Sequence, residues 1–105
     1  MLWVMRTKRG TMPTDRPERY AKQLASHWAR RGEQVEDGTS TTLTFDTGQV
    51  VVLRPAADRL DLEVSVPEDG DLDVDRFAQV VAEHLQRFGQ RDELHVAWDS
   101  PSRPS

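Results

Sequence analysis

The sequence predicts one α+β domain, a two-layer sandwich in which two helices pack on one face of a mainly antiparallel sheet. Two segments carry apolar residues at helical spacing, and the segments between and after them alternate apolar and polar residues. At 105 residues, the chain has the length of a single domain with one core. The expected order is (β)-α-β-β-β-β-α-β. The domain is expected to span residues 8–99, with a poorly ordered N-terminus at 1–7 and a disordered tail at 100–105.

The bracketed first strand would cover Lys8 to Met12, but its alternation is poor. The first helix is predicted from Asp15 to about Arg31. Asp15 can cap it as the first member of a capping box with Glu18, and Gly32 can end it. Its apolar stripe consists of Tyr20, Leu24, His27 and Trp28.

Four strands are predicted between the helices. A weak one lies near 34–37, and two stronger ones at 42–46 and 49–54 form a hairpin through Thr47-Gly48. The segment 60–66 alternates strictly, with four aliphatic residues on one face and three polar residues on the other. This pattern predicts a sheet with one wet face.

The second helix begins among Asp71, Asp73 and Asp75, where negative charge suits the helix dipole, and Gly89 ends it. A last strand at 93–99 should point Leu94, Val96 and Trp98 inward and Glu93, His95 and Asp99 outward. The stripes and strand faces together predict a core of Tyr20, Leu24, Trp28, Phe45, Leu62, Val64, Phe77, Val81, Leu85, Phe88, Val96 and Trp98.

Composition excludes several classes of site. The chain has no cysteine, which rules out disulfides, thiolate metal sites and a cysteine nucleophile, and fits a reducing cytoplasm. The apolar start is too short for a signal peptide or a membrane span. Residues 1–31 carry eight Lys/Arg and two acids, whereas 32–105 carry six and sixteen, so the acidic remainder disfavours nucleic acid as a partner.

Two blocks of sequence resemble a known family. They are Thr14-Asp15-Arg16-Pro17-Glu18-Arg19-Tyr20 with Gln23-Leu24 and Ser26-His27-Trp28, and His84-Leu85-Gln86-Arg87-Phe88 with Arg91-Asp92-Glu93-Leu94 and Trp98. From about Thr11 to Trp98 the chain resembles the bacterial domain of unknown function family 2218. The resemblance implies a small α+β domain that is sometimes fused to siderophore-interacting, flavin-dependent ferric reductase modules. It implies a context in iron acquisition and no particular reaction.

His27 and His84 are the main candidate site. Each lies on or beside the apolar stripe of its helix, so the two imidazoles would approach each other if the helices lie side by side. Two imidazoles suit ferrous iron or zinc, with Glu83 or Asp92 as a third ligand. The simpler interpretation is a half-buried histidine that is hydrogen-bonded to a backbone carbonyl or a carboxylate.

Arg87 and Arg91 suggest an anion site near the end of the second helix, although surface ion pairs with Glu83 and Asp92 explain them as well. The spacing Asp71-x-Asp73-x-Asp75 is not a calcium loop, because the sixth and twelfth positions are Arg76 and Ala82. No phosphate-binding glycine loop occurs.

These observations predict a non-enzymatic accessory or binding domain without a cofactor, acting in the cytoplasm with a siderophore-interacting flavin reductase. Two alternatives stay open. One is a small metal-binding or metal-sensing protein that uses His27 and His84. The other is a plain interaction domain or homodimer built on the wet sheet face or an edge strand.

Overall fold

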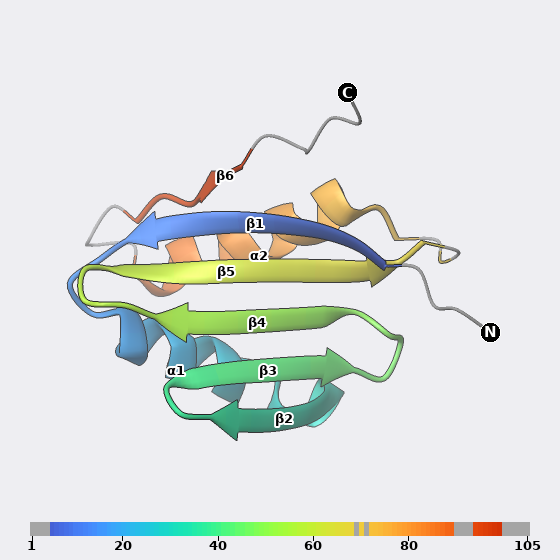
Figure 1. Ribbon diagram of the computed structural model, residues 1–105, viewed down its shortest axis with the longest axis horizontal. Coiled ribbons are helices and arrows are strands. Elements are labelled where there is room, and N and C mark those ends of the chain that lie inside the picture. Colours follow the sequence, from blue (N-terminus) through green and yellow to red (C-terminus); the bar gives the residue numbers. More distant parts are fainter. Residues whose placement is uncertain (1–4, 69, 71, 90–93, 100–105) are drawn as a thin grey trace.

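The computed structural model describes residues 5–68, 70, 72–89 and 94–99, which form one sheet covered by two α-helices. In chain order the elements are β1 (Met5–Pro13), α1 (Pro17–His27), a 3₁₀ turn (Ala29–Arg31), β2 (Gly32–Asp37), β3 (Ser40–Phe45), β4 (Val50–Pro55), β5 (Arg59–Pro67), α2 (Val74–Phe88) and β6 (Ala97–Trp98). The strands lie in the order β2-β3-β4-β5-β1-β6, and every neighbouring pair is antiparallel. Both helices lie behind the same face of the sheet (Figure 1). The predicted α+β sandwich is confirmed.

Strand β1 is longer and more central than its sequence indicates. It lies between β5 and β6 and pairs with β5 along its whole length, from Met5 opposite Pro67 to Pro13 opposite Arg59. It therefore begins three residues before the predicted domain boundary at residue 8, and Met5–Thr7 belong to the sheet. The regular alternation of β5, which buries one face, determines the register of this pairing. The sequence pattern of β1 alone does not reveal the register. The predicted disorder at 1–4 and 100–105 lies outside the described residues.

Gly10 interrupts the pattern of β1 because it makes room for a side chain from the other end of the chain. It lies opposite Trp98 of β6, and a Cβ atom at this position would lie 2.5 Å from Cε3 of the indole. The predicted last strand over 93–99 is shorter than expected, since only Ala97 and Trp98 pair with β1. Leu94 and Val96 are buried and His95 is exposed, as the alternation predicts. Glu93 lies outside the described residues.

The Gly10→Ala substitution should loosen the contact between β1 and β6. The added methyl group must displace the indole of Trp98, at a cost of about 1 kcal/mol. The reporter is the amide of Asp99, which donates a 2.8 Å hydrogen bond to the carbonyl of Arg9. We expect its hydrogen exchange to accelerate about fivefold, as 1 kcal/mol implies, while amides of β5 facing β4 stay protected. Unchanged exchange at Asp99 would show that Trp98 does not depend on Gly10.

The predicted capping box at the start of α1 is wrong. The helix begins at Pro17 with Arg16 as its N-cap, and no side chain caps it. Thr14 instead accepts a 3.0 Å hydrogen bond at Oγ1 from the backbone N–H of Arg16, which forms a local turn that moves Asp15 out of capping position. The α-helix itself ends at His27, earlier than predicted, but a 3₁₀ turn continues to Arg31. Gly32 is the C-cap of that turn, as predicted for the helical segment, and it is also the first residue of β2. In α2, Gly89 ends the helix as predicted, by donating to the carbonyl of Leu85.

The core lies between the sheet and the helices. Most of the predicted core residues are buried, whereas Phe45, Phe88 and Trp98 are partly buried and pack against it. The prediction omitted several fully buried residues, among them Met12 of β1 and Leu53 of β4. In the described part of the chain, neither helix combines the length and the apolar character that crossing a bilayer requires.

Candidate functional site

The seam between α1 and α2 brings the two candidate histidines together. His27 occupies the last position of α1 and His84 lies near the end of α2, and their ring centroids are 5.0 Å apart with planes inclined by 51°. His27 is exposed and His84 is half-buried, so the pair lies where the seam meets solvent. The approach that the helical stripes suggest is therefore present in the structure.

Aromatic rings surround the pair. The indole of Trp28 lies 4.9 Å from the ring of His84, and the ring of Phe88 lies 5.6 Å from that of His27. Trp28 is buried and continues the contact inward, edge-on to Phe45 of β3. We call His27, Trp28, His84 and Phe88 the seam cluster. These ring contacts hold both imidazoles against apolar surface on one side and leave the other side open.

A hydrogen bond defines the tautomer of His84. Its Nδ1 atom lies 2.7 Å from the carbonyl oxygen of Val80, one helical turn earlier. A carbonyl can only accept, so Nδ1 carries a proton, and in the neutral ring the lone pair is then on Nε2. This is the backbone contact of the simpler interpretation, and it is also the contact that metal-binding histidines make with their second nitrogen.

The predicted third ligands do not join the pair. Glu83 lies on another flank of α2, where it accepts a 3.5 Å hydrogen bond from Gln79 and borders a hollow that includes Lys8 and Trp98. Asp92 lies outside the described residues. Within the described ranges, no group of three His, Asp or Glu side chains is arranged to hold a metal ion. A site that uses this pair would have two protein ligands from the described part of the chain.

The predicted anion site stays a prediction. Arg87 is exposed and forms no ion pair with another described residue, and Arg91 lies outside the described residues. His95 is exposed near β6, as expected.

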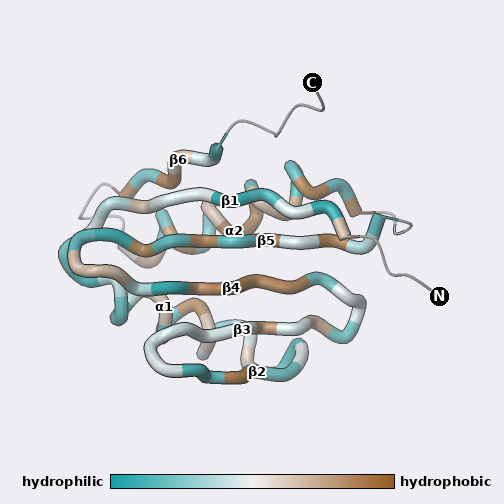
Figure 2. Tube along the Cα trace, in the orientation of Figure 1, coloured by the Kyte–Doolittle hydropathy of each residue, from teal (hydrophilic) through white to brown (hydrophobic). Residues whose placement is uncertain are grey.

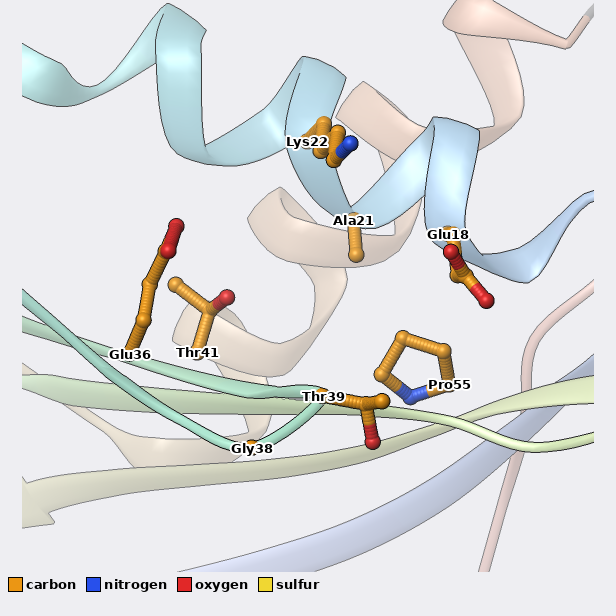
Figure 3. Close-up of a pocket in the computed structure, with 8 residues that line it drawn as sticks. All are labelled: Glu18, Ala21, Lys22, Glu36, Gly38, Thr39, Thr41 and Pro55. Atoms are coloured by element: carbon orange, nitrogen blue, oxygen red, sulfur yellow. The ribbon is translucent and has the colours of Figure 1, made fainter.

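A polar hollow that the sequence does not reveal lies between α1 and the β2–β3 hairpin (Figure 3). Its volume is about 230 Å³. Glu36 and Thr41 point from the strands toward α1, and Glu18 and Lys22 lie on the helix above them (Figure 3). The hollow depends on the hairpin folding under α1, so local sequence patterns give no signal of it. Its open, mixed-charge lining can hold water or a small polar molecule and shows no set of groups aimed at one ligand.

The face of the sheet opposite the helices carries a row of ion pairs. Glu63 of β5 lies between two arginines, 3.1 Å from Arg9 of β1 and 3.2 Å from Arg54 of β4, and its side chain is only 18% exposed. In the next row Arg59 lies 3.1 Å from Asp61. The contacts of Glu63 join three neighbouring strands.

Next to the ion pairs, the same face carries an apolar strip across β2, β3 and β4. Leu43, Val51 and Leu53 are buried under the helices, so their strand neighbours point to the opposite face. The valine–threonine strip consists of three of these neighbours, Thr42, Val50 and Val52, and of Val35 on β2, which lies on the same face. Val35 lies opposite Thr42, which lies opposite Val52, and Val35 is 57% exposed. Figure 2 shows the hydrophobic stretch along β4.

Comparison with known proteins identifies the family. Residues 9–99 match the family described as "Uncharacterized protein conserved in bacteria (DUF2218)". The chain belongs to this family. The DUF2218 match contains both sequence blocks that carry the resemblance, which is thereby confirmed, and it brings no activity with it. No curated protein matches the chain.

A solved structure supports the fold of this DUF2218 domain. The NMR structure of PA4090 from Pseudomonas aeruginosa superposes with a TM-score of 0.68 and 24% sequence identity, covering 93% of this chain and 99% of that one. At this identity the likeness concerns the fold alone. The function of the DUF2218 domain therefore has to be argued from its own surfaces.

Proposed function

We propose that this protein is a non-catalytic binding domain that docks onto a siderophore-interacting flavin reductase in the cytoplasm and serves bacterial iron handling. The class of partner follows from the fusions that the family resemblance implies. The surface is inferred from one observation, the valine–threonine strip on a sheet face that the helices do not cover. A domain that is fused to an enzyme in some proteins can bind the same class of enzyme as a separate chain in others.

The ion pairs and the apolar side chains on this face of the sheet favour the docking of a partner. Glu63 pairs with both Arg9 and Arg54, so its carboxylate is not left unpaired when the face is covered, and the trio keeps a net charge of +1 that suits an acidic rim on the partner. Side chains that are held by such pairs lose less conformational freedom on binding than mobile ones do. Beside them, Val52 and the exposed Val35 offer apolar area on a flat surface.

The test is calorimetric titration of the protein with a siderophore-interacting flavin reductase from the same bacterium. We expect a one-to-one complex that the Val52→Lys substitution weakens at least about tenfold, because a lysine places an unpaired charge in the interface. The free protein is expected to tolerate lysine here, because Val52 is only partly buried and lies on the sheet face that the helices do not cover. Gln23→Lys is the matched control: it adds the same charge at an exposed position of α1 on the opposite side of the sheet, and affinity should not change.

Absence of heat with the wild-type protein would reject the proposed partner. Equal weakening by both lysine variants would reject the proposed surface. Sedimentation should find the free protein monomeric. A dimer that Val52→Lys dissociates would assign the strip to a second copy of the chain, against the proposal.

A further inference from the structure

We propose that His27 and His84 form a two-imidazole binding site for a borderline divalent transition metal, for which zinc is the probe. The site uses the helix side of the molecule and does not depend on the partner proposed above. Nothing in the family description assigns a ligand to these residues.

The separation of the rings fits chelation of one ion. Zinc–nitrogen bonds of about 2.0–2.1 Å place each ring centroid roughly 3.2 Å from the metal. Two centroids 5.0 Å apart then subtend an angle of about 100° at the ion, close to the tetrahedral value that zinc adopts. The distance between the two rings is therefore compatible with one shared metal ion.

Each neutral ring has a nitrogen lone pair available for a metal ion. The proton on Nδ1 of His84 is held by the carbonyl of Val80, which leaves Nε2 as the ligand atom and orients the ring. His27 is exposed and forms no hydrogen bond within the described part of the chain, so its ring can turn toward the ion. One ligand is thus positioned in advance and the other adjusts.

The residues around the two imidazoles determine how exposed a bound metal ion would be. Trp28 and Phe88 border the rings on the protein side, so a bound ion would take its other ligands from the solvent side. The remaining coordination positions face solvent and can take water or a ligand from another molecule. Imidazole ligands favour zinc, copper, nickel and iron over magnesium or calcium. The arrangement predicts an exchangeable site and not a closed structural one.

The experiment is a zinc titration of the whole chain, followed by NMR of the three histidine side chains. We expect the resonances of His27 and His84 to shift together and to saturate at one zinc per chain, with a dissociation constant of roughly 100 μM or below. Changing either histidine to glutamine should weaken binding at least about tenfold and remove the response of the other ring. His95→Gln is the matched control, because it removes an exposed imidazole elsewhere and should leave the response unchanged.

The proposal is overturned by any of three results. The two resonances could stay unchanged at millimolar zinc, the response of His84 could persist in His27→Gln, or the response could disappear in His95→Gln. His27 is exposed, so His27→Gln is expected to stay folded, and its methyl spectrum verifies this. Zinc does not report on the valine–threonine strip, so failure here leaves the reductase titration to be judged on its own.

Discussion

Replacing Trp28 with alanine should lower the free energy of unfolding by about 4 kcal/mol. The side chain is 8% exposed and lies between Phe45 of the sheet and His84 of α2, so its removal leaves a cavity where three elements meet. A domain of this size is stabilised by roughly 5–15 kcal/mol in total, and the loss would be a large share of it. Urea denaturation followed by circular dichroism measures the change.

Two comparisons show whether position or residue type causes this loss. Trp28→Phe keeps an aromatic ring against Phe45 and His84 and should cost much less. Trp98→Ala removes the same side chain from a half-buried place at the sheet edge and should also cost less. A loss for Trp28→Ala no larger than that for Trp98→Ala would mean that Trp28 does not hold the seam to the sheet.

Replacing Gly32 with alanine should destabilise the protein by about 3 kcal/mol. Gly32 begins β2 opposite Phe45, and a Cβ atom there would collide with the carbonyl oxygen of Thr44. The obstacle is backbone in a paired strand, which cannot turn away as a side chain can. The φ angle of 170° is ordinary extended geometry, so the cost comes from the contact and not from the backbone conformation.

Gly38 provides the matched control in the same hairpin. Its φ of +63° disfavours alanine, but a Cβ atom there would meet nothing within 4 Å. Gly38→Ala should therefore cost only about 1 kcal/mol. If both variants unfold at the same urea concentration, the close approach of β2 to β3 at Gly32 is not as described.

The elements that the sequence predicts best are those whose pattern repeats on one face. The alternation of β5 and the stripes of both helices depend only on which side is buried, and these three elements form in the predicted segments, although the ends of α1 differ. Strand β1 lacks the regular alternation because two residues on its core-facing side contact residues that are far away in the sequence. Lys8 reaches Asp75 of α2 at 2.7 Å, and Gly10 accommodates Trp98. Asp75 and Trp98 are both more than sixty residues away from these positions in the sequence, so no local pattern can reveal the contacts.

The sequence predicts the approach of the two histidines in the candidate site but not the other residues around it. His27 and His84 lie on helical stripes, and two stripes packed on one sheet have to meet at a seam. Glu83 could not join them, because adjacent helical positions point about 100° apart. The hollow under α1 and the pairing of Glu63 with Arg9 and Arg54 depend on strand register, which the sequence leaves open.

The two-imidazole site can be tested directly by diffraction from crystals grown with zinc, recorded at the zinc absorption edge. The structure predicts an anomalous peak at the seam, about 2.0–2.1 Å from one nitrogen of His27 and from Nε2 of His84. The His84→Gln variant should lose this peak under the same conditions. Zinc bound only elsewhere, for example at His95, with the two seam imidazoles unoccupied, would contradict the site.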